Sequence, residues 1–256
     1  MDLVERNSDS SIRHPWEIAR LRFFTKLLGT RGVLTTKQLL DVGSGDAWFA
    51  TSLLSNLSED TQMTCWDAYY SPEDLATESA SPSRLHLTNA QPSGRFGGVL
   101  MLDVIEHVED DTGFVNNIVK NLLQQGGWVL VSVPAYQWLY SEHDRQLKHF
   151  RRYSPRQMRS VLLSAGLDIK AEGGVFHTLL IPRIVEVAYE RFRQSQPDGI
   201  GLGRWSHGPF LTRLVTSVLG AENALSLFVG RQKTLLLPGL SYWAFCTKSE
   251  HVDSLD

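Results

Sequence analysis

The chain has 256 residues, of which 42% are hydrophobic and 21% are charged, and its formal net charge is -3. These values are typical of a globular protein with one sizeable core, and they argue against general binding to nucleic acids. The two cysteines, Cys65 and Cys246, are too few for a disulfide framework or a cysteine zinc site, which favours a reducing cytoplasm. No apolar run reaches the ~18 residues needed to cross a bilayer, and the first residues lack the apolar core of a signal peptide.

Short apolar runs alternate with helical patterns along the first two thirds of the chain. Residues 12–30 predict a first helix that caps the cofactor site, with Trp16 and Phe23 as its packing residues. Continuous apolar runs predict buried strands at Lys37–Gly43, Gln62–Asp67, Gly97–Asp103 and Gly127–Pro134, with a weaker strand near Leu85.

The helices between these strands carry start and stop signals. Ser71 and Ser154 are predicted N-caps, each followed by a proline and by a residue that can complete a capping box. Gly166 is the predicted end of the second of these helices, and a helical pattern from Thr112 is predicted to end at Gly126.

This alternation predicts an α/β fold, a doubly wound Rossmann-like sheet of seven strands with helices on both faces. The sheet is expected to be mostly parallel, with an antiparallel last strand. The final pair of strands, "LDIKAEGGVF" and "LSYWAFCTK", is separated by roughly sixty residues that hold two apolar helical stretches. We interpret residues 178–240 as a helical insertion within a single domain of residues 1–256. The insertion is either a lid or substrate subdomain, or a subdomain packed on the sheet edge.

The stretch "LLDVGSGDAWFA", residues 39–50, joins the first strand to a helix through Gly43 and Gly45. Glycine there permits unusual backbone angles and close approach of a ligand, although a plain tight turn is the alternative. Asp67 ends the next strand, where an acid can accept hydrogen bonds from both hydroxyls of a ribose. A dinucleotide would need a third glycine where Trp48 stands, and Asp46 would repel a pyrophosphate. The stretch therefore favours a nucleoside ligand without phosphate and with positive charge.

Four stretches together carry a family resemblance: "LLDVGSGDA", "WDAYYSPEDL", "GGVLMLDVIEHVEDD" and "LLQQGGWVLVSVPAY". They resemble the glycine motif, the second-strand acid, the fourth strand with its loop, and the fifth strand of class I S-adenosylmethionine-dependent methyltransferases. The likeness is to the ubiquinone-biosynthesis-like branch (types 11, 12 and 23), and it covers about residues 39–166. It implies methyl transfer from S-adenosylmethionine, with S-adenosylhomocysteine as the product.

The resemblance also implies which residues hold the cofactor. Glycine and acid side chains at the first strand would meet the methionine part and its ammonium, with N-capping as an alternative role for Asp46. Asp67 would hold the ribose, Ala68 or Asn89 would border the adenine, and Asp103 would face the methyl-transfer zone. Asn89 stands where the family often has an aspartate, and Ala47 replaces a common glycine. The cofactor-binding set is Asp41, Gly43, Ser44, Gly45, Asp46, Asp67, Ala68, Asn89 and Asp103.

The loop "IEHVED" after the fourth strand allows several interpretations. Glu106 and His107 could act as bases, or could bind a divalent metal together with Asp103, because carboxylates and imidazole suit such ions. The alternative is a helix start in which these groups satisfy backbone donors. We favour this alternative and expect no metal.

The polar stretch from Tyr140 to Arg159 follows the fifth strand and is expected to face the acceptor. It resembles an "HD...H.RRY" pattern in a subgroup of bacterial methyltransferases. We predict His143 and His149 as candidate bases, with Asp103 as the third catalytic residue. The predicted acceptor-binding residues are Tyr140, Asp144, Arg152 and Tyr153. The arginines of this polar stretch predict either a pocket for an anionic acceptor or a solvated helix face whose arginines pair with carboxylates elsewhere.

The late insertion combines apolar and basic residues, which suits a lid over a greasy substrate or contact with an anionic membrane; packing on the sheet edge is the alternative. We therefore expect methylation, at oxygen, of a small-molecule or lipid-linked acceptor, by a cytoplasmic protein with peripheral contact to the inner membrane face. No nucleic-acid partner is expected. The alternatives are a regulatory protein that binds the cofactor without turnover, and a nicotinamide oxidoreductase.

Overall fold

The computed structural model describes residues 13–78, 84–193, 205, 207–229 and 237–249. Seven strands form one sheet in the order β3-β2-β1-β4-β5-β7-β6. The strands are β1 (Gln38–Val42), β2 (Gln62–Trp66), β3 (Leu85–Thr88), β4 (Phe96–Leu102), β5 (Leu123–Pro134), β6 (Leu167–Val175) and β7 (Ser241–Lys248). The first five strands pair in parallel, and β7 runs antiparallel to both β5 and β6. The predicted doubly wound sheet with an antiparallel last strand is confirmed.

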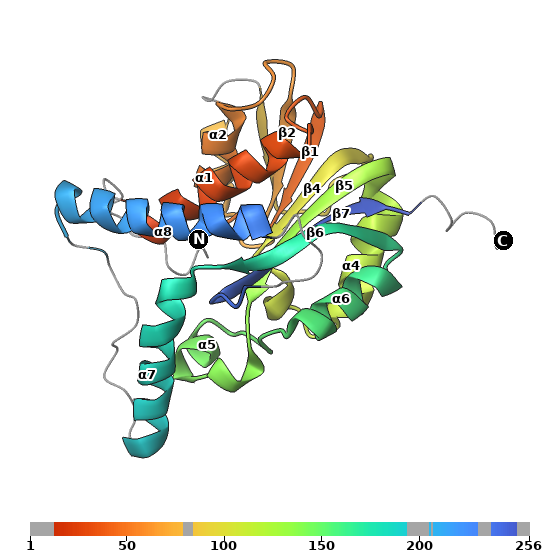
Figure 1. The fold of residues 1–256 in the computed structure, drawn as a ribbon. Coiled ribbons are helices and arrows are strands. Elements are labelled where there is room, and N and C mark those ends of the chain that lie inside the picture. Colours follow the sequence, from red (N-terminus) through yellow and green to blue (C-terminus); the bar gives the residue numbers. More distant parts are fainter. Residues whose placement is uncertain (1–12, 79–83, 194–204, 206, 230–236, 250–256) are drawn as a thin grey trace.

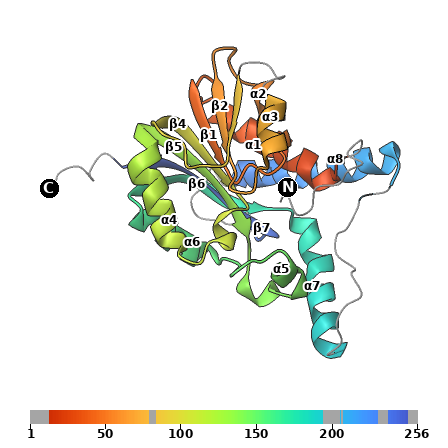
Figure 2. The ribbon, with the colours of Figure 1, turned by 180° about the vertical axis from the view of Figure 1, so that it is seen from behind.

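Helices cover both faces of this sheet (Figures 1 and 2). Adjacent residues of β1 point to opposite sides, so that Leu39 belongs to one hydrophobic core and Leu40 to the other. The first core lies under α1 (Pro15–Thr30), α2 (Trp48–Leu54) and α8 (Pro209–Val229). The second lies under α4 (Asp111–Asn117) and α6 (Pro155–Ser164). The continuous apolar runs in the central strands reflect this burial on both faces.

Both helix starts for which capping signals were predicted are found in the structure. Helix α3 (Pro72–Glu78) begins after Ser71, and α6 begins after Ser154 with a complete capping box. Gly166 follows α6 with φ +74°, as a residue that ends a helix often does. Phe23 of α1 is buried in the first core, and Trp16 packs against that core.

The predicted end of the fourth helix at Gly126 and the predicted start of β5 at Gly127 are wrong. Helix α4 ends at Asn117, a single wide turn η3 (Ile118–Leu122) follows, and β5 already begins at Leu123. Leu123 pairs with Phe96, and the register then shifts so that Gly98 pairs with Trp128. Gly126, with φ +70°, therefore lies within an irregular strand rather than at a helix end.

The carboxyl ends of β1, β2, β4 and β5 meet at one edge of the sheet, where the connecting segments gather. These are η2 (Ile105–His107), η4 (Gln137–Leu139) and α5 (Glu142–Gln146), with α7 (His177–Arg193) beside α5 (Figure 1). Helices α7 and α8 occupy the described part of the insertion, and its residues 194–204, 206 and 230–236 lie outside the described residues. None of the helices in the described ranges combines the length and hydropathy that a membrane span requires.

Candidate active site

The turn after β1 is shaped for close approach of a ligand. Gly43 has φ +62°, and a Cβ there would meet the Val104 side chain at 2.6 Å, so only glycine fits. The N–H of Gly45 donates to Asp67 Oδ2 at 2.9 Å, and the N–H of Tyr69 donates to Asp67 Oδ1 at 3.0 Å. These bonds fix the carboxylate of Asp67 beside the turn. A carboxylate oxygen can accept more than one hydrogen bond, so this arrangement is compatible with ribose hydroxyls.

The neighbouring residues of β2 and β3 line the same side of the edge. The hydroxyls of Ser44 and Tyr70 are 2.8 Å apart, which joins the glycine turn to the segment after β2. The Asn89 amide donates to the carbonyl of Tyr70 at 3.4 Å, and this leaves its amide oxygen as an acceptor. Ala68 and Asn89 are both exposed, as a border for a bound base requires.

Acidic groups surround a single buried arginine at the ends of β1 and β4. Burial raises the pKa of Asp41 to about 7, although the nearby Arg20 opposes this rise. Arg20, from α1, forms an ion pair with Asp103 and lies over the rings of Trp16 and Phe49. Asp103 has φ +59° and also accepts a hydrogen bond from Ser132 at 3.3 Å. A residue of the first helix thus enters the predicted methyl-transfer zone.

Asp46 is held by a second residue that precedes α1. The Arg13 guanidinium is 2.5 Å from Asp46 Oδ2 and lies 4.9 Å from the centre of the Trp48 ring. The other oxygen of Asp46 accepts the N–H of Trp48 at 3.2 Å, at the first turn of α2. The N-cap of α2 is Ala47 and carries no side-chain cap bond, so Asp46 holds the turn before the helix and does not cap it. Ala47, between these residues, has φ +56°, a left-handed conformation that glycine adopts without strain.

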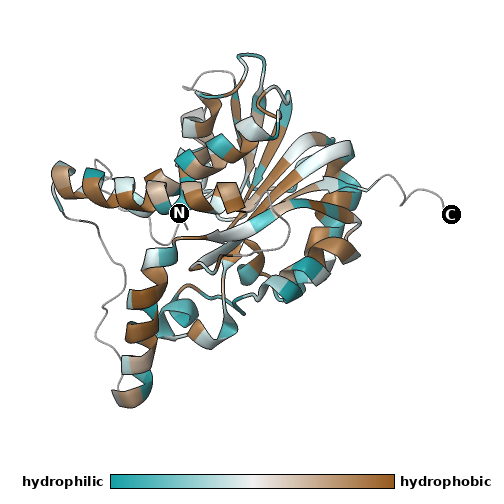
Figure 3. Cartoon of the chain, viewed as in Figure 1, coloured by the Kyte–Doolittle hydropathy of each residue, from teal (hydrophilic) through white to brown (hydrophobic). Residues whose placement is uncertain are grey.

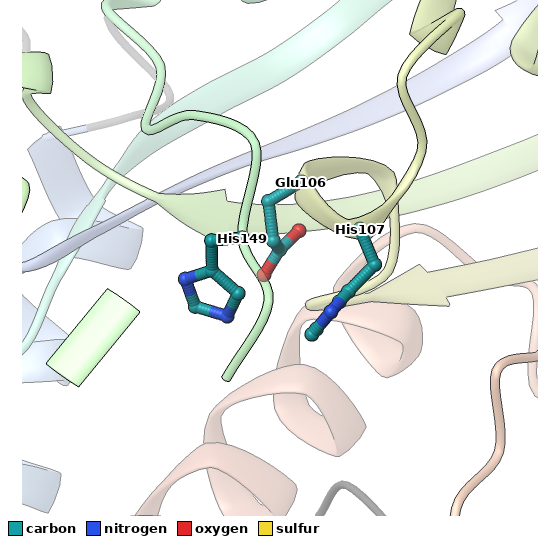
Figure 4. A group of neighbouring side chains, drawn as sticks. All are labelled: Glu106, His107 and His149. Carbon is teal, nitrogen blue, oxygen red and sulfur yellow. The ribbon is translucent and has the colours of Figure 1, made fainter. Parts of the chain in front are cut away.

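Three side chains converge at the end of β4 (Figure 4). Ligand atoms of Glu106, His107 and His149 all lie within 4.8 Å of one another, and the two imidazole rings meet edge to face at 4.6 Å. Burial, and next the charge of Asp103, raises the pKa of Glu106 well above its usual range. The Oε2 atom of Glu106 is buried without a hydrogen-bond partner. A carboxylate with two imidazoles is a donor set that can hold a divalent cation. The set differs from the one that the sequence suggested, since His149 takes the place of Asp103, which is paired with Arg20.

Asp144 orients the imidazole of His149 through a hydrogen bond to Nδ1. Its Oδ1 lies 2.9 Å from His149 Nδ1 and 2.8 Å from Arg152 Nε, and its Oδ2 lies 3.1 Å from Arg183 Nη2. Burial alone would raise the pKa of this fully buried carboxyl, but the bonds from His149 and Arg152 outweigh it and hold the pKa well below its usual range. An ionised Asp144 keeps the proton of the imidazole on Nδ1, which leaves Nε2 as a lone-pair donor.

The two candidate histidines are thus not equivalent. His149 bonds to Asp144 and lies in the cluster with Glu106 and His107. His143 lies outside that cluster, and burial, followed by the charge of Arg183, lowers its pKa. The spacing "HDRQLKH" alone could not separate them, because the separation arises where the chain turns at Lys148, with φ +59°.

A family model described as a methyltransferase domain matches residues 13–172. The chain belongs to this methyltransferase family. The match spans more than half of the sequence and includes every strand from β1 to β5. The sequence alone left a methyltransferase and a nicotinamide oxidoreductase as alternatives. The family match supports the first, so the protein is an S-adenosylmethionine-dependent methyltransferase. No curated protein matches the sequence.

Solved structures share the fold of this methyltransferase at low sequence identity. A protein assigned as a sarcosine dimethylglycine methyltransferase from Galdieria sulphuraria is 13% identical with a TM-score of 0.55, over 91% of this chain and 85% of that one. The [4+2]-cyclase SpnF is 18% identical with a TM-score of 0.55, over 96% and 85%. Phosphoethanolamine N-methyltransferase 2 of Haemonchus contortus, in complex with S-adenosylmethionine, is 19% identical with a TM-score of 0.52, over 89% and 52%. These likenesses show the fold alone.

The predicted acceptor-binding residues of the methyltransferase are mostly buried and paired. Arg152 is bound to Asp144, and the Tyr153 hydroxyl donates to Asp111 at 2.8 Å. The Tyr140 hydroxyl donates to the carbonyl of His149 at 2.7 Å, which helps to hold that residue. Three further arginines pair with carboxylates, as the second interpretation of this stretch expected: Arg145 with Glu142, Arg151 with Asp111 and Arg159 with Glu172.

Sequence reasoning missed two arginines of the methyltransferase site. Arg20 and Arg183 lie on α1 and α7, far along the chain from the carboxylates that they bind. The sequence contains little signal for either arginine, because both helices also carry other charged residues. Both side chains are almost completely buried, and a buried charge is rare unless it is paired.

Proposed function

We propose that the methyltransferase transfers a methyl group to a hydroxyl oxygen of a small, lipid-like acceptor, with His149 as the proton acceptor. The observation that carries this proposal is the hydrogen bond from His149 to the buried, doubly ion-paired Asp144 at the carboxyl edge of the sheet. A hydroxyl needs such a base because its proton must leave as the oxygen is methylated.

The residues at β1 and β2 fit the cofactor. Asp67 would bind the ribose hydroxyls, and Asn89 and Ala68 would border the adenine. The acids Asp41 and Asp46 would lie near the ammonium; Asp46 pairs with Arg13, and Arg20 pairs with the neighbouring Asp103. Gly43, Ser44 and Gly45 would meet the methionine part, and Arg20 is placed to pair with its carboxylate in exchange for Asp103. When bound, the cofactor supplies a methyl group activated by its sulfonium.

The chain's own residues would orient the acceptor and accept its proton. Asp144 holds the imidazole of His149 in one tautomer, so that Nε2 can accept a proton without rearrangement. Phe150, half exposed, continues from His149 and is bound to the loop after β4 through its N–H to the carbonyl of Glu106. Trp138 is also half exposed, and Tyr136 lies near it. These rings support an apolar acceptor, whose packing would exclude water from the transfer site.

The test compares His149→Gln with the matched control His143→Gln. Cofactor affinity is measured by titration calorimetry, and methyl transfer is followed with methyl-labelled S-adenosylmethionine against a panel of hydroxylated lipids and small phenols. We expect His149→Gln to keep cofactor affinity and to lower transfer by about 10²-fold, as loss of a general base does. His143→Gln should keep both properties. Equal transfer by wild type and His149→Gln would refute the assignment of the base.

A second interpretation is favoured by the buried, unpartnered Oε2 of Glu106. A divalent cation held by Glu106, His107 and His149 would polarise the acceptor hydroxyl, and Asp144 would then orient a ligand instead of a base. The two interpretations differ in one readout. Dialysis against a chelator should leave transfer unchanged if His149 is the base, and should abolish it if a cation is required.

A further inference from the structure

Helix α8 contacts the first core through Leu219, Val215 and Leu227, but most of its fully buried residues are polar. Four of the five carry hydroxyl or amide groups, and three of these four form hydrogen bonds. Asn223 accepts the N–H of Phe176 at 3.0 Å, Ser226 donates to the carbonyl of Gly174, and Thr212 accepts from Trp205 at 2.6 Å. A helix on a globular domain normally buries most of its apolar residues, whereas α8 buries mainly polar ones and exposes many apolar ones.

The outward side of α8 carries the large apolar residues instead. They recur at helical spacing along one stripe: Phe210, Leu214, Val218, Leu225 and Phe228. Phe210 is 81% exposed and Phe228 is 66% exposed. The small residues Ala221 and Ala224 and the hydroxyl of Ser217 complete the stripe, which has no acid.

Helix α7 also exposes a row of apolar residues, although Val187 is buried and Leu179 packs on the first core. Its inward side carries Arg183, which bonds to Asp144, Ser141 and Glu186. Its outward stripe consists of Ile181, Ile184, Val185, Tyr189 and Phe192, and Phe192 is 90% exposed. Figures 1 and 3 show both helices at the margin of the molecule, away from α4 and α6, with apolar residues along them. Contiguous exposed apolar surface of this kind marks an interaction site.

Charge indicates the occupant of this surface. Among the described residues of α7 and α8, Arg191 and Arg213 are exposed, whereas Glu186, Glu190 and Glu222 are only partly exposed. The Arg191 guanidinium also donates to the carbonyl of Trp138. Two copies of this face would bring arginine against arginine, whereas an anionic lipid surface would attract both the cations and the apolar stripes.

We propose that the outward stripes of α7 and α8 dock the methyltransferase on the surface of a bilayer that contains anionic lipids. Docking would insert the phenylalanines into the interface and place the arginines at the headgroups. Because Arg183 ties α7 to Asp144, the docked helix is joined directly to the segment that orients His149. This proposal concerns binding alone and holds whether or not the acceptor is itself a lipid.

Flotation with vesicles tests the proposal on the full chain without cofactor. Vesicles of phosphatidylcholine alone are compared with vesicles that contain phosphatidylglycerol. We expect Phe192→Ser and Phe228→Ser each to weaken binding by about tenfold, because each removes a fully inserted ring. The matched control is Leu163→Ser, another exposed apolar residue on α6, which should bind like wild type.

Charge reversal separates the two contributions. Arg213→Glu should weaken binding to the anionic vesicles by about tenfold and have little effect on the weak binding to phosphatidylcholine, whereas Lys120→Glu should change neither. Near-identical vesicle binding by wild type, Phe192→Ser and Phe228→Ser would overturn the proposal. So would a concentration-dependent dimer in size-exclusion light scattering that these substitutions abolish, because the face would then join two copies. Since binding is read without turnover, this failure is distinct from failure of the proposed methyl transfer.

Discussion

The buried carboxyl of Asp41 should make cofactor binding depend on pH. Burial raises its pKa to about 7 in the unliganded protein, so the group is mostly neutral at pH 6 and mostly ionised at pH 8. The ammonium of the cofactor, which we propose lies beside Asp41, would favour the ionised form. The ligand therefore binds the ionised fraction of the protein, and apparent affinity rises as the pH rises through about 7.

The magnitude follows from that fraction. With a pKa of about 7, roughly one molecule in eleven is ionised at pH 6 and roughly ten in eleven at pH 8. Apparent affinity should therefore increase about tenfold over this range, which is about 1.4 kcal/mol. At pH 7 each binding event should release about half a proton from Asp41. Asp41→Asn has no proton to release, and its affinity should lack this increase.

Titration calorimetry in two buffers of different ionisation enthalpy measures both quantities, with S-adenosylhomocysteine as the ligand. The amine of the ligand ionises equally with wild type and with the variant. The difference between the two proteins in proton release therefore belongs to Asp41. Asp46→Asn is the matched control, because it removes a second carboxylate near the same site, one that is bound to Arg13, and should keep the wild-type increase. If Asp41→Asn kept the wild-type slope and proton release, Asp41 would not be the group that faces the ammonium.

Three further substitutions test the local geometry. Ala47→Gly should raise the free energy of unfolding by roughly 0.5–1 kcal/mol, because the strain of alanine in a left-handed conformation exceeds the entropy cost of glycine. A lower melting temperature would contradict this. Asp67→Ala should weaken cofactor affinity by about 1.5–3 kcal/mol in calorimetry, and unchanged affinity would show that the ribose assignment is wrong. Arg183→Met should lower the free energy of unfolding in urea by about 3 kcal/mol or more, since it leaves the buried Asp144 with one cation fewer, and a neutral effect would show that Arg152 alone suffices.

The sheet and its glycine turn could be predicted because they depend on local patterns. Continuous apolar runs define strands that are buried on both faces, and Gly43 stands where a Cβ would collide with Val104. Capping residues such as Ser154 act within four positions of themselves, so they too can be read from the sequence. The end of α4 could not be predicted, because it depends on pairing between Leu123 and the distant Phe96.

Contacts across the sheet edge account for the rest of the site. Arg20 and Asp103 are 83 positions apart, and Arg183 and Asp144 are 39 positions apart, so no spacing rule links either pair. The basic stretch around Arg152 suggested an anion pocket because its carboxylate partners lie elsewhere in the chain. Only tertiary structure shows that this arginine is already neutralised and that His149, rather than His143, receives the oriented carboxylate.

Helices α7 and α8 illustrate a different limit of periodicity. A stripe of apolar residues at helical spacing specifies a face but not its direction, and burial against the domain is the usual expectation. In α8 part of the inward face is polar because Asn223 and Ser226 satisfy backbone groups of the chain around β6, which apolar side chains could not do. In α7 the inward face includes Arg183, which reaches Asp144. These inward polar groups take positions that apolar residues usually fill, and both apolar stripes face outward, where we propose that a membrane surface binds them.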